Sequence, residues 1–318
     1  MAGTISKVLV TGGAGFIGSH IVDRLIDKGF EVGILDNLST GTRENVHDGS
    51  GELKFHNADI REFLEVKEIV KQYDAIVHQA AIVSVKRSIE NPNFTNDVNI
   101  GGTLNLLKAS IDSGIRRFVY ASSSSVYGDT ETLPKKENML TQPISPYAVS
   151  KLAGENYCKA FARVYGLVTV SLRYFNVYGP RQKYGPYSGV IPTFVKAVMN
   201  DKDPIIFGDG LQTRDFTYVS DVVEANCLSL TKTTRLGEVF NIAAGKEVAI
   251  NDLAHKIIVI FGKSYLKPDH VEKRKGDVSR SYADIAKASE QLGYRPKYDL
   301  EEGLRNVVQW FSQKGENF

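Results

Sequence analysis

The sequence has little cysteine, little net charge and no long apolar run. Its only cysteines are Cys158 and Cys227, which excludes a disulfide scaffold or a CxxC metal site and favours two buried thiols in a reducing compartment. The formal charge of +2 gives no argument for a nucleic-acid partner. No run of about 18 apolar residues predicts a membrane span. An expected first strand near Lys7 leaves no room for a signal peptide, so we expect a cytoplasmic protein without metal, membrane or nucleic-acid partners.

The first half of the chain alternates between strand and helix patterns. A length of 318 residues, 42% of them hydrophobic and 24% charged, is ordinary for a soluble protein with a large core. Unbroken apolar strands separated by amphipathic helices predict an α/β Rossmann fold, a doubly wound parallel sheet with right-handed crossovers. The predicted strands are Lys7–Thr11, Glu31–Asp36, Leu53–Asn57, Ala75–Gln79, Arg117–Ser122 and Val168–Arg173, and the predicted helices are Phe16–Lys28, Arg61–Gln72, Asn96–Ser113 and Pro146–Tyr165.

The alternation breaks after Asn176. Tyr178–Ser188 is rich in Gly, Pro, Tyr and Arg and is expected to be a loop. Helix Asp221–Thr231 and strand Val239–Ala243 are expected to return to the sheet. We therefore predict a dinucleotide domain of residues 1–176 with about 216–243, and a smaller C-terminal α/β substrate-binding lobe of 177–215 and 244–318. The lobe is expected to hold helices Pro192–Met199, Ile250–Phe261, Ile285–Leu292 and Leu300–Gln313, and strand Thr213–Val219.

A glycine-rich turn joins the first strand to the first helix. Gly12, Gly15 and Gly18 are spaced three apart, as G-x-x-G-x-x-G. Gly12 permits a tight turn, Gly15 leaves space for a pyrophosphate at the helix N-terminus, and Gly18 permits close packing. By itself the pattern could be an ordinary βα turn. Together with the strand, the helix and a following acidic residue it predicts a dinucleotide site.

That acidic residue is Asp36, at the end of the second strand. A carboxylate there can accept hydrogen bonds from an adenosine ribose and would repel a 2′-phosphate, which favours NAD over NADP. Loops after the neighbouring strands would complete the site. The predicted NAD-binding residues are Gly12, Gly15, Phe16, Ile17, Asp36, Asn37, Ser39, Asp59, Ile60, Gln79, Ala80, Ala81, Asn99, Tyr147 and Lys151.

Tyr147 and Lys151 lie four residues apart behind Pro146, which suits the first turn of a helix. Residues at this spacing share a helix face. An ammonium and a positive nicotinamide would favour the phenolate, making Tyr147 a base for an alcohol proton. An isolated YxxxK is more often a buried Tyr beside a surface Lys. Downstream of the glycine turn and Asp36, the pair predicts catalysis.

A serine run, Ser122–Ser125, follows the fifth strand. A hydroxyl from Ser123 could bond the reacting oxygen, although such a run is also a common strand-ending turn. Asn99 is expected to hold the geometry around Lys151. Ser123, Tyr147 and Lys151 are the predicted catalytic residues.

The chain resembles the extended short-chain dehydrogenases/reductases, specifically the NAD-dependent nucleotide-sugar 4-epimerases of the UDP-glucose/UDP-galactose type. The resemblance runs nearly end to end. It implies that Asn176 and Arg214 contact UDP, that Arg274 binds a phosphate and that Asp277 holds the uridine ribose. The motifs that carry it are Thr11–Gly18, Asp36, His78–Ala81, Ser122–Gly128, Tyr147 with Lys151, Arg173–Asn176, Gly208–Gly210, Arg214–Phe216, Arg274 and Gly276-Asp277.

Two differences within the family suggest the reaction and the sugar. Sugar 4,6-dehydratases carry Asp-Glu after the catalytic hydroxyl and decarboxylases carry a Glu, whereas this chain has Ser124 and Ser125. The resemblance therefore implies an epimerase that inverts sugar C4 through a transient 4-keto intermediate with tightly bound NAD. A bulky Tyr in place of Ser281 is typical of enzymes restricted to unacetylated sugars. We therefore expect a UDP-hexose 4-epimerase for UDP-glucose/UDP-galactose and also UDP-GlcNAc/UDP-GalNAc, with Ser84, Ser123, Ser124, Tyr147 and Ser281 near the sugar.

Two alternatives stay open. UDP-glucuronate 4-epimerases share the four-serine run, and Lys86 or Arg87 could meet a carboxylate. A catalytically silent NAD sensor or scaffold would use the same fold. The family resemblance also implies a homodimer formed through the helices of Asn96–Ser113 and Tyr147–Tyr165, with Ala153, Tyr157 and Phe161 either on that face or in the core.

Overall fold

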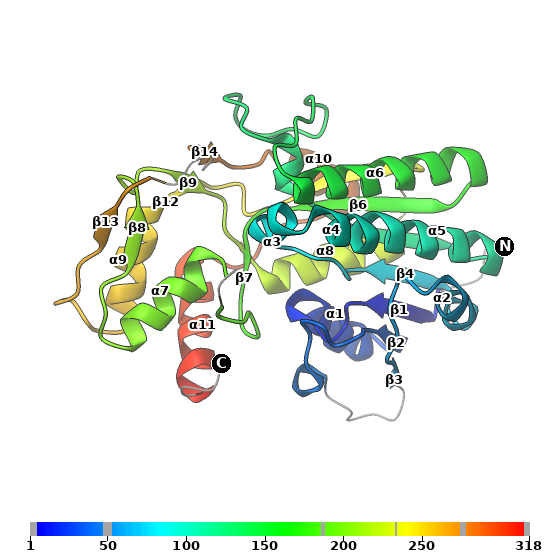
Figure 1. The fold of residues 1–318 in the computed structure, drawn as a ribbon, viewed down its shortest axis with the longest axis horizontal. Helices are drawn as coiled ribbons and strands as arrows, with labels where there is room; N and C mark the ends of the chain where they lie inside the picture. Colours follow the sequence, from blue (N-terminus) through cyan, green and yellow to red (C-terminus); the bar gives the residue numbers. More distant parts are fainter. Residues whose placement is uncertain (1–4, 47–52, 186–187, 233, 274–277, 315–318) are drawn as a thin grey trace.

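A computed structural model describes residues 5–46, 53–185, 188–232, 234–273 and 278–314. The described chain forms a large sheet domain and a smaller lobe beside the carboxyl ends of its strands (Figure 1). The sheet domain has the α/β Rossmann architecture that the alternating pattern predicts, and a smaller α/β lobe accompanies it.

Seven parallel strands of the described chain form the central sheet, in the order β11-β6-β5-β4-β1-β2-β3. The order reverses direction between β1 and β4, which is where open parallel sheets bind ligands. Central strands such as β4 are fully buried, because helices cover both faces. The strands are β1 (Lys7–Thr11), β2 (Glu31–Leu35), β3 (Leu53–His56), β4 (Ala75–His78), β5 (Arg117–Ser123), β6 (Val168–Tyr174) and β11 (Glu238–Ile242).

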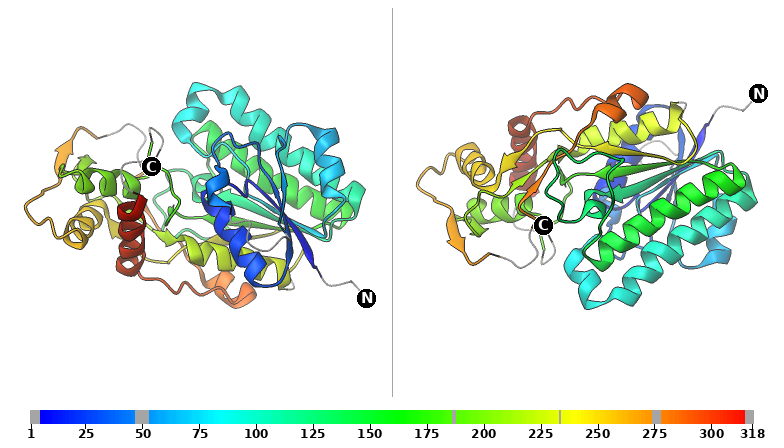
Figure 2. Two further views of the ribbon diagram at one scale, coloured as in Figure 1. Left: turned by 90° about the horizontal axis from the view of Figure 1, so that it is seen from below. Right: turned by 90° about the horizontal axis from the view of Figure 1, so that it is seen from above.

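Two helical layers cover the sheet, on opposite sides in Figure 2. α1 and α8 pack together on one face, and α2, α5 and α6 pack on the other. Each layer contributes to its own apolar cluster, so the core is divided by the sheet. The helices are α1 (Phe16–Asp27), α8 (Val219–Thr231), α2 (Phe63–Val70), α3 (Val85–Glu90), α4 (Pro92–Asn96), α5 (Gly102–Ser113) and α6 (Pro146–Tyr165).

In its described residues, the smaller lobe contains three helices and short strand pairs. Its strands β12-β9-β14 form one small sheet and β13-β8 another, while β10 pairs with β7 between the lobe and the sheet domain. The elements are β7 (Val177–Tyr178), α7 (Val190–Met199), β8 (Ile205–Phe207), β9 (Thr213–Arg214), β10 (Thr217–Tyr218), β12 (Val248–Ala249), α9 (Ile250–Ile260), β13 (Asp269–Val271), β14 (Arg280–Ser281) and α11 (Leu300–Lys314).

Three predicted elements differ in the structure. The expected helix Asn96–Ser113 is interrupted by a π turn, Asp97–Gly101, between α4 and α5. The expected strand Thr213–Val219 is divided into β9 and β10, because Asp215 turns inward and binds other loops. α10 (Ala286–Leu292) packs on β11 and α8 of the sheet domain, not within the lobe where we predicted it.

Candidate active site

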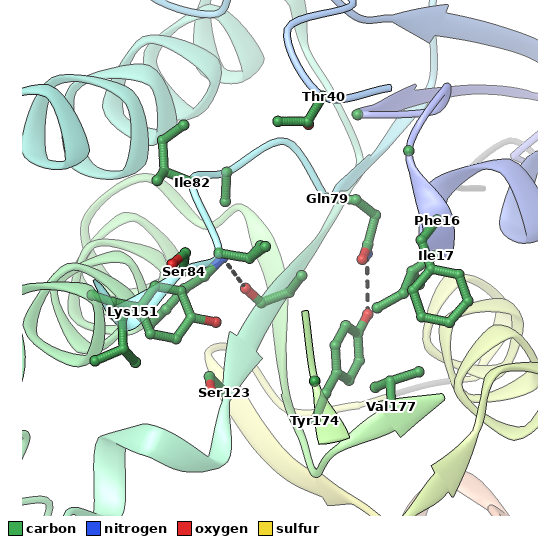
Figure 3. Close-up of a pocket in the computed structure, with 18 of the residues that line it drawn as sticks. Phe16, Ile17, Thr40, Gln79, Ile82, Ser84, Ser123, Lys151, Tyr174 and Val177 are labelled. Carbon is green, nitrogen blue, oxygen red and sulfur yellow. Dashed lines mark hydrogen bonds between the residues drawn. The ribbon is translucent and has the colours of Figure 1, made fainter. Parts of the chain in front are cut away.

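A cavity of about 1610 Å³ follows the carboxyl ends of the central strands and continues to the lobe. Its sheet side includes the glycine turn and the serine run, and its lobe side includes Phe207, Arg214 and Ser281. In Figure 3, Ser84, Ser123 and Lys151 lie on one side, and Phe16 and Ile17 lie across from them. The cavity therefore joins the predicted dinucleotide and sugar regions.

The three glycines of the turn lie close to neighbouring backbone atoms. Gly12 has φ +69° and lies so close to the loop after β4 that a Cβ would come within 2.7 Å of the Ala80 nitrogen. A Cβ on Gly18 would meet the Gly12 oxygen at 2.1 Å, so Gly18 packs against the turn itself. A Cβ on Gly15 would contact only the Gly12 oxygen, at 3.1 Å. Gly15 lines the cavity at the start of α1 and carries no side chain, which fits a pyrophosphate close to the backbone.

Asp36 lines the cavity and is 8% exposed. Its two carboxylate oxygens accept hydrogen bonds from the backbone N–H groups of Ala14 and Leu38, at 3.0 and 2.8 Å. Burial raises the pKa of Asp36, and these two donors oppose that rise. Each oxygen keeps a second lone pair, so the carboxylate can still accept ribose hydroxyls.

Asp59 is tied to its own loop. Arg61 forms a bidentate pair with it, at 3.0 and 2.8 Å, and Asn37 donates a hydrogen bond to it at 2.9 Å. The Arg61 hydrogen bonds lower the pKa of Asp59 to about 2. The remaining predicted cofactor residues Phe16, Ile17, Ser39, Ile60, Gln79, Ala80 and Ala81 line the same cavity.

Tyr147 and Lys151 project from the first turns of α6 into the cavity. Ser145 caps this helix by accepting a hydrogen bond from the Ala148 N–H, and Pro146 opens it. The Lys151 ammonium is 4% exposed and donates a hydrogen bond to the Ala121 carbonyl at 2.9 Å. Burial lowers the pKa of Lys151 to about 8. The pair thus shares one helix face, as its spacing predicts.

Ser123 ends β5 beside this pair. Its oxygen accepts hydrogen bonds from the Ser125 N–H at 3.2 Å and the Ser125 hydroxyl at 2.9 Å. Its own proton therefore remains available for an oxygen in the cavity. Burial raises the pKa of Tyr147, and the Ser123 hydroxyl opposes that rise. A base at Tyr147 consequently needs the added positive charge of Lys151 and of a bound nicotinamide.

Asn99 lies behind the cavity and not on its lining. Its amide exchanges two hydrogen bonds with the backbone of Ile82, at 2.7 and 3.0 Å, and donates one to Ser150 at 2.9 Å. Asn99 therefore joins the loop after β4 to α6 next to Lys151. Asn99 is not among the residues that line the cavity, so its predicted contact with NAD stays a prediction.

The lobe side collects the residues expected to bind the nucleotide. Arg214 and Ser281 are partners in the register of β9 and β14, and both line the cavity. Asn176 also lines it and donates a hydrogen bond to the Asp215 carbonyl at 2.9 Å. Arg274 and Asp277, predicted from the resemblance, lie outside the described residues.

Several lining residues were missed by sequence reasoning. They include the exposed apolar side chains of Val83, Val85, Ile89 and Ile144. The predicted residues Ser84 and Ser124 line the cavity as well. Lys86 lines the cavity, whereas Arg87 is not among the lining residues. The loop after β7 contributes Arg181, Gln182, Lys183 and Tyr184. Its Gly, Pro, Tyr and Arg content marked it as a loop but not as part of the site.

The described residues contain no group of three metal-ligating side chains and no helix long and apolar enough to cross a membrane.

Comparison with known proteins agrees with this geometry. A family model described as GDP-mannose 4,6 dehydratase matches residues 9–307. A UDP-glucose 4-epimerase of Mycolicibacterium smegmatis is 38% identical, covering 98% of this chain and 100% of that protein. The solved UDP-N-acetylglucosamine 4-epimerase of Methanobrevibacter ruminantium superposes with a TM-score of 0.94 at 40% identity, covering 98% of this chain and 100% of that one. A Thermus thermophilus UDP-glucose 4-epimerase in complex with NAD gives a TM-score of 0.88 at 38% identity, covering 96% and 99%.

The cavity, its glycine turn and the Tyr147–Lys151 pair therefore belong to a redox-competent Rossmann enzyme. The chain belongs to the extended short-chain dehydrogenase/reductase family of NAD-dependent nucleotide-sugar epimerases and dehydratases. This confirms the predicted family and the predicted NAD cofactor. Relatives include a UDP-glucuronate 4-epimerase, a UDP-N-acetyl-alpha-D-glucosaminuronate decarboxylase and a dTDP-glucose 4,6-dehydratase, so membership does not fix the reaction.

Proposed function

We propose that the protein is a UDP-hexose 4-epimerase. The observation that carries this proposal is the absence of a carboxylate at the two positions after Ser123, next to Tyr147 and Lys151 in the cavity. Tyr147 and Lys151 provide an alcohol base and its supporting charge, while the next two positions, Ser124 and Ser125, provide hydroxyls and no carboxylate. Water elimination and decarboxylation in this family use acidic groups at those positions. Without them, oxidation and re-reduction of the same carbon is the reaction that remains.

The cofactor would be NAD, held between the glycine turn and Asp36. The missing side chain at Gly15 and the remaining lone pairs of Asp36, both on the cavity wall, fit its pyrophosphate and adenosine ribose. When bound, NAD would supply the hydride acceptor and donor for the sugar C4 carbon. Tyr147 takes the proton of the C4 hydroxyl, Ser123 donates a hydrogen bond to that oxygen, and Lys151 supplies positive charge.

The substrate would be held by its nucleotide while the sugar turns. Arg214, on β9 of the lobe, and Asn176, between β6 and β7, line the cavity with Tyr147. A guanidinium can neutralise a diphosphate. Binding energy at the nucleotide leaves the sugar free to present either face, which inversion at C4 requires.

The sugar would be a neutral hexose, with or without a 2-N-acetyl group. The apolar side chains of Val83, Val85 and Ile89 line the cavity and suit the faces of a pyranose and an acetyl methyl group. Ser281 leaves more space than a tyrosine would. One observation favours a second candidate, UDP-glucuronate. Lys86 lines the cavity and could pair with a carboxylate, although it also forms an ion pair with Glu90 at 4.0 Å.

Purified protein tests the two sugars directly. It should be incubated separately with UDP-glucose, UDP-GlcNAc and UDP-glucuronate, and the anomeric protons followed by NMR. We expect conversion of the first two to their C4 epimers. Conversion of UDP-glucuronate alone would replace our substrate with the second candidate.

Replacing Tyr147 with Phe tests the assigned base. The variant keeps the ring and loses only the hydroxyl, so NAD should still co-purify while epimerisation falls by at least about 100-fold. Absorbance of released NAD and the NMR assay measure these separately. Retained activity would refute the base, and an inactive wild type that binds NAD would favour the sensor or scaffold alternative.

Replacing Ser281 with Tyr tests the roomy pocket. The ring would fill space beside Arg214, so turnover of UDP-GlcNAc should fall by about 10-fold or more while UDP-glucose turnover is retained. Ser281→Ala is the size-matched control and should leave the ratio of the two rates unchanged. Equal losses on both sugars would contradict the pocket assignment.

A further inference from the structure

A fully buried ion pair lies directly behind the serine run. Glu155 is 0% exposed and Arg173 is 2% exposed. The Arg173 Nε and Nη2 atoms donate to the two Glu155 oxygens at 2.9 and 2.8 Å, a bidentate arrangement. The Ser122 hydroxyl donates to the Glu155 Oε1 atom at 2.5 Å. One carboxylate therefore joins three elements, α6, β5 and β6.

The three elements are those that carry the chemistry. Tyr147, Lys151 and Glu155 are spaced by four residues along α6, so they lie on one face in successive turns. Ser122 immediately precedes Ser123 on β5, and its partner in the β5–β6 register is Arg173. The Lys151 ammonium bonds the carbonyl of Ala121, one residue earlier. Two adjacent connections thus fix the end of β5 to the catalytic helix.

Arg173 also supports the far side of the serine run. Its guanidinium lies 4.7 Å from the centre of the Tyr127 ring. Tyr127 ends the 3₁₀ turn Ser124–Tyr127, and its hydroxyl donates to Asn241 at 2.6 Å. Ser123 is therefore held from both directions along the chain, through Ser122 before it and Tyr127 after it.

We propose that Glu155, held by Arg173, is a positioning residue that sets the place of Ser123 relative to Tyr147 through the Ser122 hydroxyl. Stability by itself does not account for the pair, because a buried ion pair gains little over well-packed apolar side chains. The Glu155–Arg173 pair is connected to the C-terminal end of β5 through Ser122 and to the serine turn through Tyr127, which explains why two charges are placed there. The proposal rests on the epimerase function for its kinetic readout only.

Ser122→Ala is the direct test, because it removes the connection and keeps the ion pair. We expect kcat for UDP-glucose to fall by about 10- to 100-fold, since small misplacements of a reacting group have effects of that size. KM for UDP-glucose should remain unchanged, because the nucleotide contacts are on the lobe side. Ser122→Thr keeps the hydroxyl and should retain most of the rate.

Ser229→Ala is the matched control. Ser229 is equally buried, and its hydroxyl bonds the Ala225 carbonyl within α8, away from the cavity. It should leave kcat and KM unchanged. If Ser122→Ala also leaves kcat unchanged, or lowers it only in proportion to a loss of folded protein seen by circular dichroism, the proposal is overturned.

A second readout does not depend on turnover. With ¹³C-labelled tyrosine, the Tyr147 ring resonance can be assigned by its absence in Tyr147→Phe and followed against pH. Ser122→Ala should raise the titration midpoint of Tyr147, because the Ser123 hydroxyl no longer supports the phenolate. An unchanged midpoint overturns the positioning role. If no UDP-sugar is converted by the wild type, the proposed function fails and this readout decides the positioning role separately.

Discussion

His78 is buried between two threonines at the end of β4. Its ring nitrogens bond the Thr11 and Thr103 hydroxyls at 2.7 and 2.9 Å, and its side chain lies against Phe118 and Tyr120. Burial, with a smaller contribution from the Lys151 charge, lowers the pKa of His78 to about 3. The folded protein therefore keeps His78 neutral where the unfolded chain would already bind a proton.

This difference predicts acid lability. Above the unfolded pKa of about 6.5, His78 is neutral in both states and carries no penalty. As pH falls toward the folded pKa, only the unfolded chain binds a proton at His78, so the free energy of unfolding decreases. The loss is at most about 1.4 kcal/mol per pH unit. In His78→Gln, urea unfolding between pH 4.5 and 7.5 should show a shallower pH dependence of the free energy of unfolding. It should also show a loss of about 1 kcal/mol at pH 7.5 from the missing hydrogen bond.

His255→Gln is the control for that experiment. His255 is exposed on α9, and its replacement should leave the slope as in the wild type. Equal slopes for wild type and His78→Gln would show that other groups govern the acid response.

At the residue scale, spacing identified some groups and missed others. The Tyr147–Lys151 pair follows from helical periodicity, because residues four apart share a face. The Glu155–Arg173 pair does not, because its partners come from α6 and β6 and meet only where the helix packs on the sheet. Asn99 was predicted to lie near Lys151, and it does contact the adjacent Ser150. Only the folded chain shows that its amide donates hydrogen bonds to Ile82 and Ser150.

At the element scale, the start of α1 depends on glycine. A Cβ on Gly18 would lie 2.1 Å from the Gly12 oxygen, a backbone atom that cannot move without opening the turn. We expect Gly18→Ala to lose co-purified NAD and to lower the free energy of unfolding by about 2 kcal/mol or more. NAD absorbance and thermal unfolding measure these two losses.

Gly101→Ala is the matched control in another helical segment. A Cβ added to Gly101 would meet no atom within 4 Å, and the φ of this residue is −58°. This substitution should retain NAD and leave stability unchanged or slightly raised, since alanine favours helix over glycine. Retention of NAD by Gly18→Ala would refute the close packing of the turn.

Element boundaries failed where tertiary contacts compete with local pattern. The strand expected over 213–219 is divided at Asp215, whose carboxylate accepts backbone hydrogen bonds from Ala244, Gly245 and Ala283. Those donors are far away in sequence, so an alternating pattern gives no sign of them. The short helix α3 was also missed, because six residues contain too little periodicity.

At the scale of the whole molecule, the resemblance predicts a homodimer through α5 and α6. Phe161 is 8% exposed and belongs to the core beneath α6, so packing explains it without a partner. Ala153 and Tyr157 are half-buried on the same helix and stay candidates for the interface. Ala153→Glu should convert a dimer to a monomer in size-exclusion chromatography with light scattering.

Val259→Glu is the control for the dimer experiment. Val259 is 58% exposed on α9 in the lobe, and its replacement should leave the oligomeric state unchanged. A monomeric wild type, or an Ala153→Glu dimer, would exclude this interface.

The sequence by itself determined the sheet domain, the glycine turn and the placement of Tyr147 and Lys151 on one helix face. These features depend on local spacing: alternating apolar strands and helices, glycines three apart, and Tyr147 and Lys151 four apart. The tertiary structure alone decided which distant loops face one another across the cavity. The position of Arg214 beside Ser281 and the Glu155–Arg173 pair behind Ser123 depend on contacts between segments far apart in the chain, which local periodicity does not encode.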